Sequence, residues 1–546
     1  MPYLRAPLSN PISTAGMAFI FAVLLLHTTA ASVSMPGKAF TTTTVAGVLG
    51  GGGASVDGVG TLAQFMNVFS LALQSGLNGT LYIAEGAKIR TMTPGGVVTT
   101  LAPQPGDSQT FSHPGGLAVS SNNVLYVSDT QNHVLRSVDP AGTITRLAGG
   151  GGSGCVPGVG PAAKFSNPKG IALSPLQDVL YIVDSTNNAV RNFTIADSTV
   201  RSFAGGGLSG CANGNVDGVG TNALFNYPTS IAVAPSGNLF ISHSNKVVSI
   251  AADTLSTATF AGGGAGVNAQ APGYADGFGT NALFNVIYAL VVDSAGTVFV
   301  ADAYSNKIRA ITPAGYVSTI AGLGSGYASG AFNGLGTNAA FHTPSSIVVS
   351  NTGVVYVGDS DNNAIRALTP TPCPAGYFCM NGSISTCLPG FYCPANSSAP
   401  TACPSNYYST ATSAPSIATC TPCPVGSSCP TKSTVVPCPI GYICPTAGQP
   451  PVPCPAGSYS PVTSRTSCLL CPSGSWSSAI GASFCGEFCV AGTFRSRMGG
   501  TSAANCTACP TGSFSDSVRA PGRSRRSPLY RKFTRPLSPQ TPPTHF

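Results

Sequence analysis

Leu125-Tyr126-Val127-Ser128-Asp129 is one of six related pentapeptides that recur in this 546-residue chain. The other five are Leu81-Tyr82-Ile83-Ala84-Glu85, Leu180-Tyr181-Ile182-Val183-Asp184, Leu239-Phe240-Ile241-Ser242-His243, Val298-Phe299-Val300-Ala301-Asp302 and Val355-Tyr356-Val357-Gly358-Asp359. Their aromatic residues lie 44 to 59 positions apart. Short β-branched runs repeated at this spacing and separated by turns are typical of a propeller with one four-stranded blade per repeat. The sequence therefore predicts an all-β chain whose residues 41 to 370 form a six-bladed β-propeller.

Turn residues divide each repeat into four short strands. In the second repeat we expect strands at 117–119, 125–128, 134–138 and 143–148. The phrase that ends a repeat, such as Thr319-Ile320-Ala321-Gly322, also stands before the first repeat and is missing after the last. Residues 41 to 46 are thus expected to pair beside Ile365 to Leu368. This strand would complete blade six, close the ring and cover two sheet edges.

A second pattern links an acidic residue to an arginine within the repeats. An Asp is followed seven residues later by an Arg at Asp129/Arg136, Asp184/Arg191, Asp302/Arg309 and Asp359/Arg366, and shortened versions run from Glu85 to Arg90 and from His243 to Ser249. The arginines could form a ligand-binding ring. Their fixed place in each third strand favours instead a structural bond to the preceding Asp loop.

This pattern, together with Pro114-Gly115-Gly116, Pro168-Lys169-Gly170 and the Ala-Gly loops, resembles the NHL repeat over about 330 residues. No Trp-Asp pair occurs there, because the single tryptophan is Trp476, so a WD40 array is not expected. Some NHL propellers bind RNA through a basic face. Residues 41 to 370 hold 12 basic and 15 acidic side chains, although the whole chain carries a net charge of +8. We therefore expect no nucleic-acid partner.

The long glycine-rich loops share one face of the predicted propeller with the turns between second and third strands. Variable loops on a rigid scaffold usually carry recognition, so this face is the predicted binding surface. Its candidate residues are Asn132, His133, Asn187, Asn188, Tyr304, Asn306, Asp361 and Asn362. The expected function is extracellular recognition or adhesion, with a protein or glycan as partner. The oligomeric state stays open.

Catalysis and metal binding are the competing hypotheses for the propeller. Asp57, Asp217 and Asp276 each stand in an Asp-Gly loop that offers one acid, which favours a turn over a calcium site. Histidines 113, 133, 243 and 342 are interpreted as polar loop residues. Six-bladed propellers that resemble this one include lactonase-like enzymes and lyases with a central metal, so a hydrolase or lyase is the alternative, and a structural matrix protein is a third. No catalytic residue, metal ligand or cofactor is assigned.

Seventeen of the 19 cysteines lie between Cys373 and Cys509. This density indicates a disulfide framework formed in an oxidising compartment; zinc is disfavoured because residues 371 to 515 contain no histidine. Cysteine pairs enclosing five or two residues recur here, as in Cys373-Pro374-Ala375-Gly376-Tyr377-Phe378-Cys379. The segment resembles ephrin-receptor-like repeats, also likened to tumour-necrosis-factor-receptor modules, which implies an extended stalk over 371–515. Cys155 and Cys211 occupy equivalent loops and could form a bridge or remain free thiols.

The chain ends suggest export. Met17 to Leu26 is an apolar run followed by Thr29-Ala30-Ala31, which predicts a signal peptide over residues 1–31. No later segment reaches eighteen apolar residues, so we expect a secreted or cell-surface protein with no membrane span in this chain. Candidate glycosylation sites are Asn78, Asn192, Asn381, Asn396 and Asn505. Residues 516–546 are predicted to be a disordered basic tail rich in Pro and Arg.

Overall fold

The computed structural model describes residues 37–74, 79–103, 110–150, 152–207, 211–264, 271–324 and 326–511, together with the strand positions 513–514 and 525–526. The predicted signal peptide, Asn78 and the tail apart from those strand positions lie outside the described residues. The described chain divides into two compact units, of which the first reaches Ser385 and includes residues 395–399.

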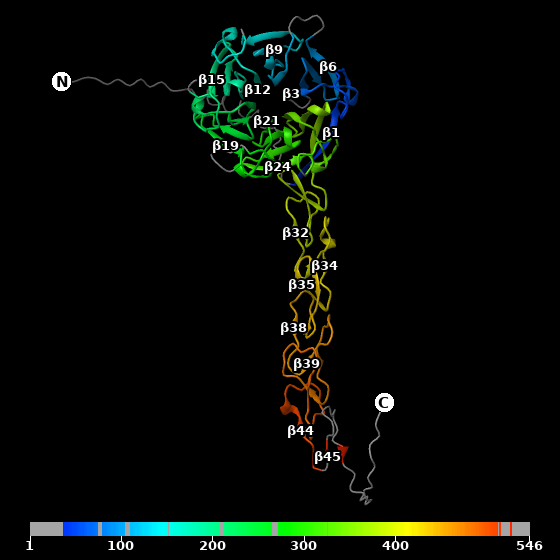
Figure 1. Ribbon diagram of the computed structural model, residues 1–546. Helices are drawn as coiled ribbons and strands as arrows, with labels where there is room; N and C mark the ends of the chain where they lie inside the picture. The colour runs from blue at the N-terminus through cyan, green and yellow to red at the C-terminus, as the bar shows by residue number, and fades with distance from the viewer. Residues whose placement is uncertain are drawn as a thin grey trace, which may run out of the picture. The chain divides into compact units, whose positions relative to one another are not determined.

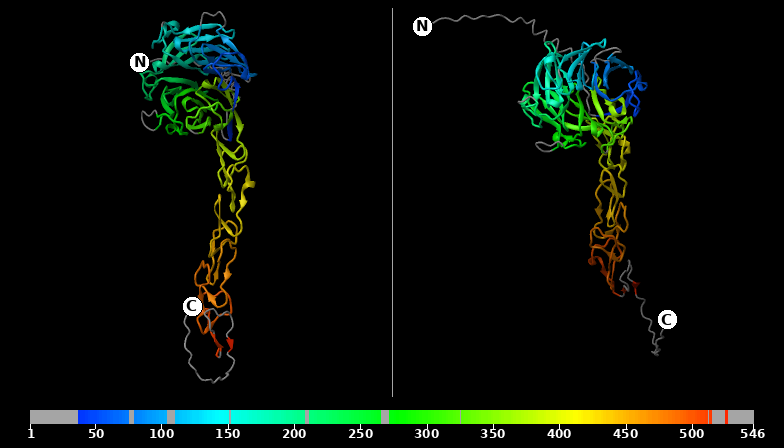
Figure 2. Two further views of the ribbon diagram at one scale, coloured as in Figure 1. Left: turned by 45° about the vertical axis from the view of Figure 1, so that its right-hand side comes forward. Right: turned by 45° about the horizontal axis from the view of Figure 1, so that its top comes forward.

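The first unit is a propeller of six antiparallel sheets arranged around a central axis (Figure 1, Figure 2). The predicted all-β fold is confirmed. Blade one contains β3 (Val68–Leu73), β4 (Leu81–Glu85), β5 (Lys88–Met92) and β6 (Val97–Ala102). Blade two contains β7 (Pro114–Val119), β8 (Leu125–Asp129), β9 (Val134–Val138) and β10 (Ile144–Ala148). Blade three contains β12 (Pro168–Leu173), β13 (Val179–Asp184), β14 (Ala189–Thr194) and β15 (Thr199–Gly205). Blade four contains β16 (Pro228–Val233), β17 (Leu239–His243), β18 (Lys246–Ile250) and β19 (Thr257–Gly262). Blade five contains β21 (Ile287–Val292), β22 (Val298–Asp302), β23 (Lys307–Ile311) and β24 (Tyr316–Ala321). Blade six contains β26 (Pro344–Val349), β27 (Val355–Asp359), β28 (Ala364–Pro372) and β1 (Lys38–Ala46).

The ring closes at blade six, as the sequence predicts. β1 runs antiparallel to β28, with Thr42 opposite Leu368 and Thr44 opposite Arg366. The ladder extends beyond the predicted six residues, because Lys38 also pairs with Pro372. The first and last parts of the propeller chain are therefore joined in one sheet.

Among the described residues, two-residue strands cover the outer edge of four blades, a feature that the sequence did not predict. They are β2 (Gly58–Val59), β11 (Gly158–Val159), β20 (Gly277–Phe278) and β25 (Gly334–Leu335), which pair with β6, β15, β24 and β1. In blade four a single bridge joins Val219 to Ser256. Each short strand lies in the loop that enters a blade, so that loop passes the outer strand of its own blade and protects its edge.

A buried phenylalanine precedes each blade and packs into the apolar layer between neighbouring sheets. The six residues are Phe65, Phe111, Phe165, Phe225, Phe284 and Phe341, none more than 3% exposed. The cores combine neighbours: Tyr82 and Ala84 of blade one lie in one cluster with Leu125 and Val127 of blade two. Burial of each such side chain contributes about 1.5 to 3 kcal/mol to stability. The strands are held on both faces, which gives the loops a rigid base.

Short 3-10 helices occupy the loops. Those that enter blades are η1 (Gly60–Leu62), η3 (Gly160–Ala162), η5 (Gly220–Asn222), η6 (Gly279–Asn281) and η8 (Gly336–Asn338). Those that connect second to third strands are η2 (Thr130–Asn132), η4 (Ser185–Asn187), η7 (Ala303–Ser305) and η9 (Ser360–Asn362). The second group ends with a left-handed residue in every case, namely His133, Asn188, Asn306 and Asn363.

The cysteine-rich segment consists of small hairpins that follow one another along the chain (Figure 1). The paired strands are β29 (Tyr377–Met380) with β30 (Ser383–Thr386), β31 (Phe391–Tyr392) with β32 (Thr401–Ala402), β33 (Tyr407–Tyr408) with β34 (Thr421–Pro422), β35 (Ser427–Thr431) with β36 (Thr434–Pro437), β37 (Tyr442–Ile443) with β38 (Val452–Pro453), β39 (Ser458–Tyr459) with β40 (Leu469–Leu470), β41 (Ser475–Trp476) with β42 (Glu487–Phe488), β43 (Thr493–Phe494) with β44 (Thr507–Ala508), and β45 (Ser513–Phe514) with β46 (Arg525–Arg526); η10 (Ile417–Thr419) and η11 (Ala503–Asn505) complete the segment.

Eight disulfides connect these hairpins. They are Cys373–Cys379, Cys387–Cys393, Cys403–Cys420, Cys423–Cys429, Cys438–Cys444, Cys454–Cys468, Cys471–Cys485 and Cys489–Cys506. Cysteines that enclose five residues are bonded to each other. The closely spaced Cys420 and Cys423, by contrast, are not bonded to each other: Cys420 bonds to the earlier Cys403, and Cys423 bonds to the later Cys429. Cross-links of this kind contribute about 2 to 4 kcal/mol each in a segment with little apolar core.

The first cysteine-rich hairpin belongs to the propeller unit, so the compact unit extends past the expected boundary at residue 370. The backbone N–H of Gly37 donates to the Cys379 carbonyl, and that of Cys373 donates to the Gly37 carbonyl. Ala39, Cys373 and Cys379 form one buried cluster. No helix in the described part of the chain is long and apolar enough to cross a membrane.

Candidate binding face of the propeller

The repeated Asp and Arg residues form buried ion pairs inside the blades. In blade six Arg366 Nη1 lies 2.6 Å from Asp359 Oδ2, and both side chains are completely buried. The same guanidinium donates to the carbonyls of Ala340 and Phe332 in the loop that enters the blade. The equivalent pairs are Arg136 with Asp129 at 2.6 Å, Arg191 with Asp184 at 3.4 Å and Arg309 with Asp302 at 2.9 Å. These arginines connect the turn, the third strand and the entering loop of one blade.

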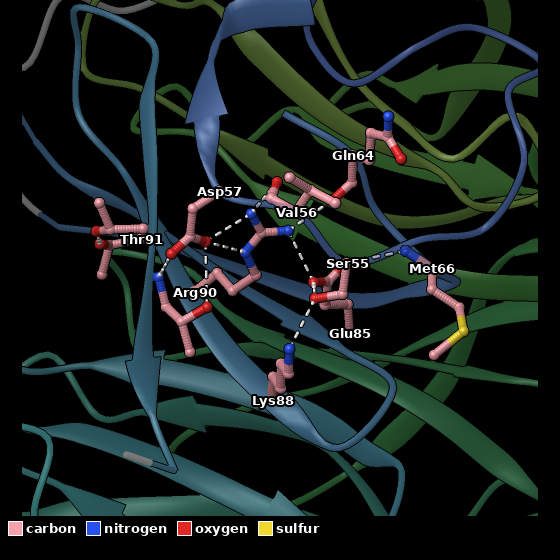
Figure 3. Close-up of polar contacts among 11 residues, drawn as sticks. Ser55, Val56, Asp57, Gln64, Met66, Glu85, Lys88, Arg90 and Thr91 are labelled. Carbon is pink, nitrogen blue, oxygen red and sulfur yellow. Dashed lines mark hydrogen bonds and ion pairs between the residues drawn. The ribbon is translucent and has the colours of Figure 1, made fainter. Parts of the chain in front are cut away.

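Blade one contains a variant of this cluster, drawn in Figure 3. Arg90 Nη1 lies 2.8 Å from Glu85 Oε1, and Nη2 lies 2.8 Å from Asp57 Oδ1. Asp57 also accepts from the backbone N–H and hydroxyl of Thr100 in β6. Asp276 repeats this role with Arg309 and Thr319. The loops at Asp57 and Asp276 therefore each hold an arginine and an outer strand in place, and Asp217 accepts from Thr259 of the outer strand in blade four.

Burial raises the pKa of two aspartates in these clusters. It raises the pKa of Asp302 to about 6, although Arg309 favours the charged carboxylate. It likewise raises the pKa of Asp184 to about 6, against opposing hydrogen bonds from Asn187 and Ser166. The clusters thus lie in an environment poor in water, which suits a structural role.

Blade four departs from the pattern, and the position that the sequence predicts to be equivalent to the arginines is wrong by one residue. Ile241 pairs with Val248, as Val300 pairs with Arg309 in blade five, so Val248 rather than Ser249 occupies the arginine position. His243 stands where the other blades have an acid. It is buried against Phe225, and its Nδ1 has no hydrogen-bond partner among the described residues. An apolar contact replaces the ion pair here.

The side chain that ends the turn between second and third strands joins each blade to the next; four of the five bridging residues are left-handed, and Asn245 is the exception. The acceptor atom of each receives a hydrogen bond from the backbone N–H that precedes the next first strand. The pairs are Asn363 with Asn67 at 3.2 Å, His133 with Asn167 at 3.0 Å, Asn188 with Tyr227 at 3.0 Å, Asn245 with Val286 at 2.9 Å and Asn306 with Thr343 at 2.8 Å. Between blades one and two this position is Ala87, which directly precedes Lys88 and has no polar side chain to offer.

Six of the eight candidate binding residues are therefore used inside the propeller. Asn132, Asn187 and Asn362 each donate to the aspartate of their own blade. His133, Asn188 and Asn306 make the bridges between blades just described. Left-handed geometry favours Asn, which is the signal that could have identified the bridging positions from sequence.

Tyr304 and Asp361 remain exposed on the face. Tyr304 is 49% exposed, and its hydroxyl accepts a hydrogen bond from Tyr288. Asp361 lies beside His342, with 3.5 Å between its carboxylate and Nε2.

A cavity of about 530 Å³ opens at the centre of this face. Its lining comes from turns between second and third strands and from the residues that begin the first strands, so both sets of connections meet there as the sequence predicts. Exposed side chains at its border include His113, Gln131 and Asp361, while Phe69, Lys169 and Tyr288 are half-buried within it. A narrower cavity of about 250 Å³ follows the channel between the first strands, where Leu71 and Ile171 are among the apolar residues that line it. We call the larger cavity the channel mouth.

The other candidate sites lie apart from the channel mouth. Among the described residues, no three His, Cys, Asp or Glu side chains gather in a way that could hold a metal ion. Cys155 and Cys211 form a disulfide, with 6.4 Å between their α-carbons, that joins the loops entering blades three and four. Asn192 lies in β14, whereas Asn381, Asn396 and Asn505 lie in the cysteine-rich hairpins and their turns.

Residues 60–369 match the family model described as the teneurin NHL domain. The chain belongs to this family. Among curated relatives, it is 25% identical to mouse teneurin-3 over 351 residues, which is 55% of this chain and 12% of the relative. It is 26% identical to bovine NHL repeat-containing protein 2 over 288 residues, 47% of this chain and 39% of the relative. It is 27% identical to the chloroplastic protein Suppressor of Quenching 1 of Arabidopsis thaliana over 268 residues, 47% of this chain and 25% of the relative. The chain thus spans less than two-fifths of the length of these relatives.

Proposed function

We propose that this chain is an extracellular recognition or adhesion protein whose propeller binds a protein or glycan at the channel mouth and the loops around it. The observation that carries the proposal is the cavity of about 530 Å³ at the loop-bearing face, lined from several blades. Pockets that bind small ligands fall in the range of about 300 to 1,000 Å³. A rigid ring with a recess lined by both polar and aromatic side chains on one face suits binding without chemical change.

Two further observations support an extracellular location. The cysteine-rich segment depends on disulfides, and Cys155 and Cys211 add another in the propeller. Such bonds persist in oxidising compartments. Membership of the teneurin NHL family agrees with this location.

We infer that the cysteine-rich segment serves as a spacer for the propeller. Its stapled hairpins and Cys spacing resemble ephrin-receptor-like repeats. A chain of small cross-linked units supplies length and resistance to proteolysis with few apolar contacts.

The proposal is tested by blocking the face with charged side chains. The double variant Gln131→Arg/Asp361→Arg places two long side chains at the border of the channel mouth, since both parent residues are exposed there. The control Asn122→Arg/Asn351→Arg makes the same kind of change at exposed turns between first and second strands, on the opposite face. Full-length labelled protein is incubated with cells, and bound protein is measured by flow cytometry.

We expect the parent and the control to bind cell surfaces and the face variant to lose most of its binding. Equal binding by both variants would show that another surface is responsible. Circular dichroism and thermal melting of all three proteins establish that each is folded.

A further inference from the structure

One position per blade forms a ring around the channel mouth. The second residue of each first strand lines this cavity in all six blades; the residues are Phe69, Gly115, Lys169, Thr229, Tyr288 and Ser345. Figure 1 shows the first strands β3, β12 and β21 on the inner side of the propeller. Because these residues occupy the same position in each repeat, all six face the same cavity.

The ring is chemically asymmetric. It contains two aromatic side chains, two hydroxyls, one glycine and a single cation, Lys169. Gly115 has no room for a larger side chain, because a Cβ would lie 2.5 Å from the Thr130 hydroxyl. That hydroxyl is committed to the carbonyl of Pro168. No acidic residue occupies the ring position in any blade.

Lys169 is the basic side chain of the channel mouth that has no anionic partner. Within the described residues its ammonium group makes no ion pair or hydrogen bond, and its backbone carbonyl instead accepts from Ser128. Burial lowers its pKa. A half-buried ammonium group without a counterion gains more from an incoming anion than a solvated one does, because its water shell is already reduced.

We propose that the channel mouth binds a carboxylated saccharide, such as a hexuronic acid residue of a glycan, with Lys169 paired to the carboxylate. This inference rests on the proposed function and names the ligand class for the same site. The hydroxyls of Thr229 and Ser345 donate their protons to the carbonyls of Ile287 and Val68. Toward a ligand their oxygens therefore act as acceptors, which can receive the hydroxyls of a sugar.

The aromatic members of the ring favour a saccharide over an acidic peptide. Phe69 packs against His113 with 5.3 Å between ring centroids, and Tyr288 packs against Tyr304 at 5.8 Å. Aromatic rings held in this way offer flat surfaces for the C–H face of a pyranose. A cavity of about 530 Å³ holds one or two sugar rings.

Asp361 is the acidic residue of this cavity, and its place explains why it does not exclude an anion. It comes from η9 at the exposed border, with 44% of its side chain accessible, and faces His342. Lys169 lies deeper, at the start of β12.

The test is a ligand titration of the full-length chain followed by saturation-transfer NMR. The probes are glucuronate, glucose as the neutral counterpart, and N-acetylglutamate amide as a carboxylate from an amino acid. The variants are Lys169→Met, which keeps the length of the side chain without its charge, and Lys169→Arg, which keeps the charge. Lys164→Met is the matched control, because Lys164 lies in the loop entering the same blade and does not line the cavity.

We expect glucuronate to bind about tenfold or more tightly than glucose and than the amino-acid probe. Lys169→Met should remove this preference, whereas Lys169→Arg and Lys164→Met should retain it. The proposal is overturned by equal binding of glucuronate and glucose, by unchanged binding in Lys169→Met, by preference for the amino-acid probe, or by no binding of any probe. If cell binding still depends on Gln131 and Asp361 in that case, the saccharide inference alone fails and the recognition function stands.

Discussion

Asn306 Oδ1 accepts a hydrogen bond of 2.8 Å from the backbone N–H of Thr343 and thereby joins blade five to blade six. Its amide nitrogen donates to the carbonyl of Tyr327 in the entering loop at 2.8 Å. Asn306 has a φ of 54°, a left-handed conformation that asparagine tolerates better than most residues. One side chain thus connects three segments that are distant in sequence, at the face where we place ligand binding.

Removing this bridge should weaken the propeller. We expect Asn306→Gly to lower the free energy of unfolding by about 1 to 3 kcal/mol, because a half-buried N–H and a carbonyl lose their partner while glycine keeps the backbone unstrained. Asn67→Gly is the control, since Asn67 is also left-handed but its side chain is exposed. Chemical denaturation of both variants and the parent gives the values. Equal stabilities of the two variants would contradict a role for the bridge.

The buried arginine of blade six should matter far more than an exposed one. Arg366→Met leaves Asp359 buried without a counterion and removes the bonds to Phe332 and Ala340, so we expect a loss of about 3 to 5 kcal/mol. Arg201 pairs with Asp197 at 3.9 Å with both side chains more than half exposed, and Arg201→Met should cost less than about 1 kcal/mol. Melting temperatures measured side by side test the difference. A small effect at Arg366 would mean that the cluster relaxes around the loss.

Acid should destabilise blade four through His243. Burial lowers the pKa of its imidazole to about 3, below the ordinary value of 6.5. The unfolded chain therefore binds the proton more readily, and the folded state loses about 1.4 kcal/mol for each pH unit below 6.5 until pH 3. The variant His243→Asn should show a flatter fall in stability between pH 6.5 and 4.5 than the parent.

The stabilities of the variant and the parent must be compared at each pH. Asp184 and Asp302 have pKa values raised to about 6 from the usual 3.8. These two groups stabilise the folded state most below pH 3.8, and this stabilisation is lost as the pH rises through 6. Their effect on stability is therefore opposite to that of His243. His113→Asn, at an exposed histidine, should follow the parent curve. Parallel curves for His243→Asn and the parent would refute the prediction.

Glycosylation should distinguish two of the candidate asparagines. Asn396 lies exposed on a turn, whereas Asn192 lies within β14 opposite Tyr181 and Arg201, and its amide oxygen is buried. In protein secreted from eukaryotic cells we expect a glycan at Asn396 and little or none at Asn192. Mass spectrometry of peptides released after N-glycosidase treatment reports each site. Full occupancy of Asn192 would require that the strand is modified before it pairs.

The sequence predicts the blades well because their signal is repeated six times. Pentapeptides such as Leu125 to Asp129 mark the second strands, and the displaced Thr44-Val45-Ala46-Gly47 phrase predicts the closing strand. Two-residue strands such as β2 were missed because a pair of residues carries no periodic pattern. The one-residue error at Val248 arose because the turn after His243 is short, and only the pairing of strands reveals which residue faces Ile241.

The candidate site was predicted less well than the fold. Asn187 and Asn362 look like free loop residues in sequence, yet their amides are directed inward to Asp184 and Asp359. The sequence shows Lys169 within the motif Pro168-Lys169-Gly170. It lines the same cavity as Phe69 and Tyr288 only because the ring brings together residues more than 200 positions apart. The local sequence pattern predicts the turn, whereas the cavity forms only from residues of all six blades.

The pairing of β1 with β28 also dictates when the protein can finish folding during synthesis. Thr42 emerges from the ribosome more than 300 residues before Leu368, its partner across the sheet. At about 5 to 20 residues per second, the first strand waits roughly 15 to 65 seconds with an unpaired edge. During that interval the nascent chain offers a free β-edge to other chains, so crowding of ribosomes on one message is the condition under which this propeller is most prone to misassemble.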